Sequence, residues 1–249
     1  GGQGEDYLDG GLGNDTLKGT DVNQDTFVIS SGQDIVEDLN TNDILLVASG
    51  ASVEATVLFD FIATGDTANE GSATILLGTA SEVDLSLAGG PNGYTVEAGD
   101  TASSLTGSAF DDVLRGGIES DILDGGDGND LLVGGDGDDD ITAGDGLDII
   151  GGLLGNDDIT LNADAVLDEV HFRTGDGSDT VTGFEVTADG IFFLDGDGSN
   201  GSVAFTKDDS ADGAAGTLFT AGDTDDYEEF AVAADFTANA NGLSDAVAL

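Results

Sequence analysis

The sequence predicts an all-β fold, a parallel β-roll or β-solenoid of nine-residue repeats with β-rich capping segments. One nine-residue pattern runs six times through residues 107–160 without an insertion or deletion. An aspartate recurs every nine residues, at Asp112, Asp121, Asp130, Asp139, Asp148 and Asp157. An aliphatic residue follows two positions after each aspartate, at Leu114, Leu123, Leu132, Ile141, Ile150 and Ile159. Acidic and apolar positions that keep one phase over six copies indicate a repeat architecture.

Each repeat contains a turn half and a strand half. In the clearest copy, residues 125–133, the glycines of the first half allow the left-handed dihedrals of a tight turn, and the second half is extended around one aliphatic residue. A strand this short cannot bury its aliphatic side chain alone. Two successive repeats therefore form one coil, and alternate copies stack into two parallel sheets that face each other. Leu114, Leu132 and Ile150 are expected to meet Leu123, Ile141 and Ile159 in a thin core.

The stacked turns place the aspartates in two rows, one along each edge of the solenoid. Asp112, Asp130 and Asp148 follow one edge, and Asp121, Asp139 and Asp157 follow the other. Carboxylates repeated at the spacing of neighbouring strands, roughly 4.8 Å, repel one another unless a cation lies between them. Hard oxygen ligands beside turn carbonyls, with no His or Cys in the repeats, select calcium over zinc or copper.

The repeats resemble the calcium-binding nonapeptide repeats of secreted bacterial hemolysin-type (RTX) proteins, whose pattern is G-G-x-G-x-D-x-U-x. Residues 1–9 and 10–18 are two further copies in phase. The resemblance implies a parallel β-roll in which calcium is held by the sixth-position aspartate and by carbonyls of the glycine turns. The implied aspartate ligands are Asp6, Asp15, Asp112, Asp121, Asp130, Asp139, Asp148 and Asp157. The implied turn glycines are Gly126, Gly128, Gly135, Gly137, Gly144 and Gly146.

Several copies depart from the family pattern. Phe110 and Glu119 replace the fourth-position glycine, Ala143 replaces the first and Leu153 the second. The sites at both ends of the central run therefore match the pattern least well.

Composition restricts the partners of the chain. It has 249 residues with 52 acidic and four basic side chains, a formal net charge of −48. Such self-repulsion opposes a compact state, so we expect order to be induced by cation binding. Nucleic acid is excluded as a partner because phosphate contacts need basic side chains. Membrane insertion is not expected because no apolar run approaches transmembrane length.

Two similar long segments follow the two runs of repeats and predict tandem modules. Residues 25–29, 32–39 and 43–47 correspond in order and spacing to residues 168–172, 177–184 and 191–194. We expect one module of N-terminal coils with a β-rich cap and insert at 1–106, and a second, with the six-repeat roll and a C-terminal β cap, at 107–249. Alternation predicts strands in the insert at 53–61, 72–77 and 83–87. This insert either continues the solenoid or forms a small sandwich.

The outer face of one predicted sheet carries an apolar stripe, which we define as Val113, Leu131, Val133 and Ile149. The outer face of the other sheet is polar, apart from Ile122. Exposed apolar stripes mark contacts. Either a flanking segment of the same chain covers this stripe, or it mediates self-association.

A catalytic role is not expected, since His171 is the only histidine and no nucleophile elbow or H-E-x-x-H motif is present. The favoured hypothesis is an extracellular or cell-surface structural protein, such as a surface-layer, filament or adhesin segment, that folds and assembles on binding calcium. The alternative is a secretion and folding module at the C-terminal end of a larger exported enzyme or toxin. The chain begins inside a repeat, which favours a fragment or processed product, and residues 239–249 are similar in character to an uncleaved type I secretion signal.

Overall fold

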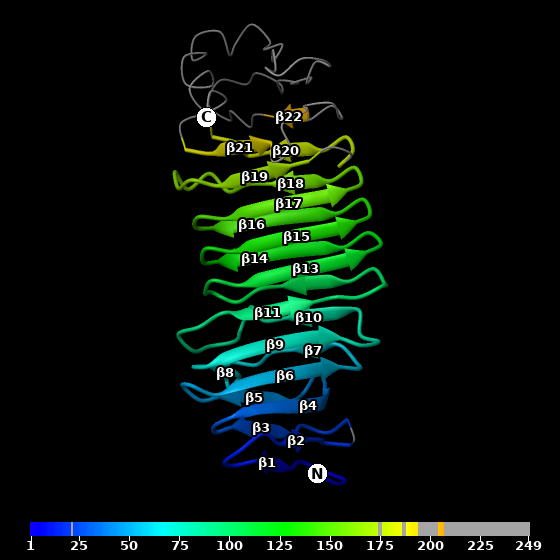
Figure 1. The fold of residues 1–249 in the computed structure, drawn as a ribbon, viewed down its shortest axis with the longest axis vertical. Helices are drawn as coiled ribbons and strands as arrows, with labels where there is room; N and C mark the ends of the chain where they lie inside the picture. The colour runs from blue at the N-terminus through cyan, green and yellow to red at the C-terminus, as the bar shows by residue number, and fades with distance from the viewer. Residues whose placement is uncertain (21, 174–175, 186–187, 194–203, 207–249) are drawn as a thin grey trace, which may run out of the picture.

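The protein is a parallel β-solenoid in which the chain winds upward coil by coil from the N-terminus. A computed structural model describes residues 1–20, 22–173, 176–185, 188–193 and 204–206. Every pair of adjacent strands is parallel, and each strand pairs mainly with the one a full coil further along (Figure 1). Because each coil contains about two strands, a strand pairs mainly with the second strand after it in the sequence and not with the next one. The sequence-based prediction of an all-β, β-roll fold is confirmed.

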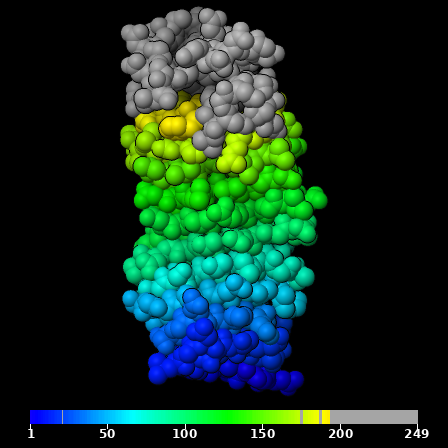
Figure 2. All heavy atoms as spheres, in the orientation of Figure 1, coloured from blue at the N-terminus to red at the C-terminus, as the bar shows by residue number. Residues whose placement is uncertain are grey.

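One sheet runs through nearly the whole described length. Its strands, in spatial order, are β2 (Thr16–Leu17), β4 (Gln33–Leu39), β6 (Ser52–Val57), β9 (Ser72–Leu77), β11 (Tyr94–Glu97), β13 (Val113–Ile118), β15 (Leu131–Asp136), β17 (Ile149–Leu154), β19 (Glu169–Phe172) and β21 (Gly190–Phe193). In the space-filling view of Figure 2 the colours change steadily along the long axis of the molecule, so residue number increases from coil to coil. We call this the long sheet.

The opposite side of the solenoid is divided into two sheets. The N-terminal one contains β1 (Tyr7–Asp9), β3 (Thr26–Ile29), β5 (Ile44–Val47) and β8 (Ala68–Asn69). The other, which we call the short sheet, contains β7 (Phe61–Ile62), β10 (Glu82–Asp84), β12 (Ser104–Thr106), β14 (Ile122–Asp127), β16 (Asp140–Asp145), β18 (Asp158–Thr160), β20 (Thr180–Thr182) and β22 (Ala204–Thr206).

The thin core predicted for the central run is present. Leu132 pairs in register with Leu114 and Ile150 on the long sheet, and Ile141 pairs with Leu123 and Ile159 on the short sheet. All six side chains are at most 1% exposed. The inward aliphatic of each repeat therefore provides the apolar burial that stabilises its coil.

The insert continues the solenoid, so the sandwich alternative is wrong. Its strands β6, β9 and β10 pair with strands of the neighbouring coils. The strand predicted at 53–61 is interrupted by a turn between β6 and β7, where Phe59 is 61% exposed. Strand pairing also continues across the predicted module boundary, since β11 pairs with β13 and β12 with β14. The division at 106/107 stays a prediction from the sequence.

The segments expected to act as caps form further coils of the same solenoid. β3 and β5 stack on β1, and β19 and β21 stack on β17. The predicted secretion signal at 239–249 lies outside the described residues.

Candidate metal centre

The glycines predicted to form the calcium turns all adopt left-handed backbone conformations. Their φ values lie between 99° and 137°, for Gly126, Gly128, Gly135, Gly137, Gly144 and Gly146. The turns also stack closely, because a Cβ atom on Gly128 would lie 2.6 Å from the carbonyl carbon of Phe110 in the preceding coil. Glu119 and Leu153 occupy equivalent turn positions with φ values of 89° and 74°, which strain a residue that has a Cβ atom.

The predicted aspartates form two hydrogen-bonded ladders, one along each edge. In each ladder the backbone N–H of one aspartate donates to the Oδ1 of the aspartate in the next coil. On one edge Asp112 donates to Asp130 at 2.7 Å, and Asp130 donates to Asp148 at 2.8 Å. The other edge repeats this arrangement through Asp121, Asp139 and Asp157, with distances of 2.8 and 2.9 Å. At the N-terminal end, Asp6 and Asp15 donate to Asp25 and Asp34.

The second carboxylate oxygen is different, because at most of these aspartates it accepts no hydrogen bond from any described residue. This buried, unpartnered Oδ2 occurs at Asp15, Asp121, Asp130, Asp139, Asp148 and Asp157. Leaving a buried ionised oxygen unpaired is costly, so each ladder presents a row of oxygens that a cation would satisfy.

At Asp121, Asp130 and Asp139 the unpartnered oxygen lies near a backbone carbonyl of the next coil, and a glycine without a Cβ atom leaves the space between them open. A Cβ atom on Gly116 would lie 2.5 Å from both the Oδ2 of Asp121 and the carbonyl oxygen of Gly134. At Gly125 the corresponding distance to the Oδ2 of Asp130 is 2.6 Å. Calcium binds oxygen ligands at about 2.3 to 2.6 Å, so this small oxygen-lined space fits the ion.

The structure adds ligand candidates that the sequence pattern did not indicate. The carbonyl groups that lie against these spaces belong to the first turn position, at Gly134, Ala143 and Gly152. The sequence does contain a clue, because side chains alternate between the two faces of a strand and this alternation predicts that the first turn position faces inward. No cluster of three or more His, Cys, Asp or Glu side chains suitable for a metal occurs in the described part of the chain. An ion in a turn would thus depend on backbone carbonyls as well as carboxylates.

Burial and mutual repulsion hold these carboxylates in an unfavourable electrostatic state. Burial raises the pKa of Asp130 to about 8, and the neighbouring charges of Asp112 and Asp148 add to the rise. Burial likewise raises the pKa of Asp157 to about 7 and that of Asp121 to about 6. A bound cation removes this penalty by supplying the opposite charge.

Two predicted ligands differ from the others. At Asp6 the Oδ2 accepts the backbone N–H of Gly2 at 2.5 Å. At Asp112 the Oδ2 accepts both the backbone N–H and the hydroxyl of Ser108, at 2.6 and 2.8 Å. Both donors, Gly2 and Ser108, stand at the second position of the motif, and at Asp112 the hydroxyl of Ser108 adds a donor that a glycine there would not provide.

Two aspartates outside the predicted set have the same geometry as the predicted ligands. Asp34 and Asp168 are at most 2% exposed, and each has an Oδ2 without a described partner. Their turns lack the glycine pattern, so the motif missed them. One part of the repeat pattern is still present in the sequence at both places, namely the aliphatic residue two positions after the aspartate, Val36 and Val170.

A family model described as the RTX calcium-binding nonapeptide repeat (4 copies) matches residues 1–21, 97–132 and 124–159. The turns of the predicted ligands fall within these segments, whereas Asp25, Asp34 and Asp168 lie outside them. The chain carries RTX calcium-binding repeats. These RTX repeats include every aspartate predicted as a ligand, and the family supports calcium as the bound ion. No curated protein matches the chain.

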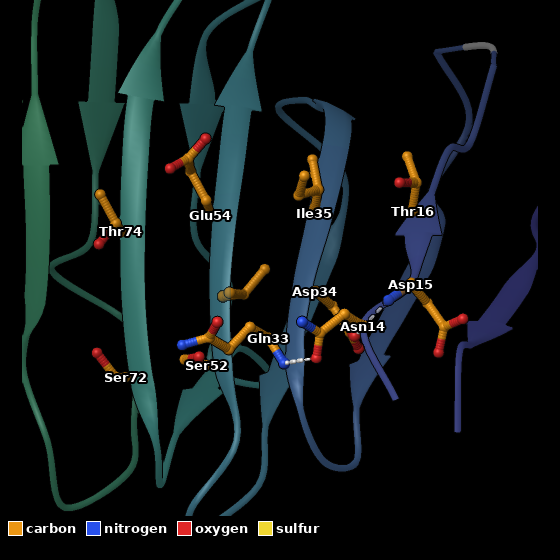
Figure 3. A pocket seen from close by; sticks show the side chains of 11 residues that line it. Asn14, Asp15, Thr16, Gln33, Asp34, Ile35, Ser52, Glu54, Ser72 and Thr74 are labelled. Atoms are coloured by element: carbon orange, nitrogen blue, oxygen red, sulfur yellow. Dashed lines mark hydrogen bonds between the residues drawn. The ribbon is translucent and has the colours of Figure 1, made fainter. Parts of the chain in front are cut away.

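Other surface features give little indication of a second chemistry. A groove of about 470 Å³ lies on the outer face of β2, β4, β6 and β9. Figure 3 shows it lined mainly by hydroxyl, amide and carboxylate side chains, with Ile35 among them and with Asp34 and Asp15 at one side. His171 contacts Glu169 through Nε2 at 3.1 Å, on the outer face of the long sheet. No helix in the described residues has the length and hydropathy needed to cross a membrane.

Proposed function

We propose that this chain is a secreted, calcium-binding structural segment, of the kind found in a surface layer, filament or adhesin, that folds and assembles on binding extracellular calcium. The unpartnered carboxylate oxygens of the two aspartate ladders carry this proposal. Calcium, as a hard cation taking oxygen ligands, is the ion these turns suit. The proposal places the protein at the cell surface or outside the cell.

Calcium binding and folding are coupled in this proposal. A chain with a net charge of −48 gains little from compaction unless its buried carboxylates are neutralised. Each bound ion would join a carboxylate of one coil to a carbonyl of the next, and its binding free energy would become folding free energy. The chain would stay expanded where calcium is scarce and fold where calcium is abundant.

The apolar stripe supports assembly as the second part of the proposal. Val113, Leu131 and Ile149 form one row on the outer face of the long sheet, and Val133 lies in the adjacent row. All four are partly exposed. On the outer face of the short sheet the equivalent rows are polar at Asp124, Asp140, Thr142, Asp158 and Thr160, with Ile122 the exception. A second copy of the chain is the partner that this one-sided stripe suits.

A matched pair of variants tests the stripe. Leu131→Asp with Ile149→Asp should abolish self-association in calcium and leave the far-UV circular dichroism of the folded state unchanged. Ile122→Asp is the control, because Ile122 is an exposed aliphatic residue, 55% accessible, on the opposite sheet. Loss of folding in the stripe variant alone would mean that the stripe is covered by the same chain, and equal association of all variants would exclude the stripe as the interface.

The proposal assigns no catalytic role to this segment. It also names no nucleic-acid partner and no membrane insertion, because the surface charge is overwhelmingly negative. The alternative function, a secretion and folding module of a larger exported enzyme or toxin, would use the same calcium turns without needing self-association.

One titration separates these functions. Far-UV circular dichroism and light scattering would be followed on the same samples as calcium is added. A cooperative transition from coil to β structure followed by growth into large particles supports the structural protein. Folding to a lasting monomer refutes assembly and favours the module of a larger protein. An unchanged spectrum refutes calcium-driven folding.

A further inference from the structure

The stacked turns fall into two classes, according to what the Oδ2 of the aspartate accepts. In open turns, such as that of Asp130, this oxygen is buried and accepts no hydrogen bond from the described residues. In capped turns, such as that of Asp112, it accepts donors from three or four residues earlier in the chain. The two classes do not coincide with the nonapeptide motif.

We propose that Asp168, outside the nonapeptide repeats, is a ligand of a further calcium site, and that Asp112, inside them, holds no ion. This inference rests on the proposed calcium binding of the repeats and redefines which turns take part. It makes the hydrogen bonding of the aspartate, and not the glycine pattern, the property that selects a site.

Asp168 continues the ladder of the central run beyond the last repeat. Its Oδ1 accepts the backbone N–H of Asp148 at 3.1 Å, as the Oδ1 of Asp148 accepts that of Asp130. Asp168 is 0% exposed, and its Oδ2 is buried without a described partner. Its carboxylate therefore has the position, the burial and the unsatisfied oxygen of the aspartates within the motif.

The turn before Asp168 supplies a second carboxylate. Asp168 follows Asp157 by eleven residues, where the repeats have nine, and Ala165 in this longer turn has a left-handed φ of 64°. Asp164 shapes the turn, because its Oδ1 accepts the N–H of Val166 and its Oδ2 accepts the N–H of Gly146.

This donor set suits a hard divalent cation. It offers carboxylate oxygens, and residues 161–168 contain no His or Cys. Leu161 stands where the repeats have their first glycine, and its side chain is buried. The ion would accordingly be held by the longer turn and not by a glycine space like the one beside Gly116.

Asp112 is already satisfied on both oxygens. Its Oδ1 accepts the N–H of Tyr94 at 2.5 Å, and its Oδ2 accepts the N–H and the hydroxyl of Ser108. Two donors on one carboxylate oxygen use the lone pairs that a cation would need. The ladder of the central run therefore ends at Asp112. In the preceding coil the equivalent position is Tyr94 and not an aspartate.

The test counts calcium ions bound by the full chain. Equilibrium dialysis and native mass spectrometry would be applied to wild type, Asp168→Asn, Asp112→Asn and, as a positive control, Asp130→Asn. We expect one ion fewer than wild type in D168N and D130N, and an unchanged number in D112N. An unchanged number in D168N overturns the new site, and a lost ion in D112N overturns the capped turn. A wild type that binds no calcium refutes the proposed function itself.

A second measurement on the unaltered chain covers the case in which D168N fails to fold. Hydrogen–deuterium exchange would be followed across a calcium titration. Protection of residues 161–168 should rise at the same calcium concentration as that of residues 125–130. If residues 161–168 stay unprotected at the calcium concentrations that protect residues 125–130, the site at Asp168 is refuted.

Discussion

Replacing Asp130 with asparagine should have opposite effects on the cation-free and the calcium-bound protein. At about pH 7.5 the unfolded carboxyl is ionised, whereas the folded carboxyl, with its pKa raised by burial to about 8, mostly keeps its proton. One pKa unit corresponds to about 1.4 kcal/mol, so this difference costs the cation-free fold on the order of 5 kcal/mol. An asparagine side chain at this position removes that cost, but its amide NH2 is buried without an acceptor, at about 1 to 3 kcal/mol.

The expected net effect is a gain of about 2 to 4 kcal/mol in the free energy of unfolding without calcium. In saturating calcium the same variant should be less stable than wild type, because one charged ligand is lost. Urea unfolding followed by far-UV circular dichroism, in chelator and in calcium, measures the change in the free energy of unfolding under each condition. If wild type is unfolded in chelator, the osmolyte concentration needed to refold each protein gives the same comparison. A cation-free D130N that is less stable than wild type would refute the reasoning.

Three further predictions concern the core, the turns and pH. Leu132→Ala should lower the free energy of unfolding in calcium by about 2 to 5 kcal/mol in urea titrations, because Leu132 is fully buried, whereas Leu12→Ala, at 92% exposure, should leave it unchanged. Glu119→Gly should raise the thermal midpoint, since it relieves a left-handed φ of 89° that costs roughly 1 to 2 kcal/mol, and a lowered midpoint would show that the side chain contributes more than the strain. The cation-free fold should lose stability as pH rises from about 4 to about 7, because the folded carboxyl of Asp157 has a pKa of about 7 and keeps a proton that the unfolded chain releases. Thermal midpoints in chelator that increase over this range would contradict that prediction.

The nine-residue period by itself determined the solenoid and the phase of its side chains. Because side chains alternate along a strand, the aliphatic two positions after each aspartate had to point inward, as Leu132 and Ile141 do. The same period put Asp130 and Asp139 on opposite edges. These features depend only on local geometry and on stacking, so the sequence was sufficient to predict them.

The tertiary structure alone decided which carboxylate oxygens are free. The hydrogen bonds that build the ladders join residues 18 to 22 positions apart, such as Asp148 and Asp168 at 20. The hydrogen bonds that cap a turn come from within it, as the N–H and the hydroxyl of Ser108 donate to Asp112. A motif specifies the composition of one turn, whereas the hydrogen bonds of a buried oxygen depend on the folded geometry of that turn and of the coil stacked against it. For that physical reason the sequence located the ladders, and only the folded chain separated the open turn of Asp168 from the capped turn of Asp112.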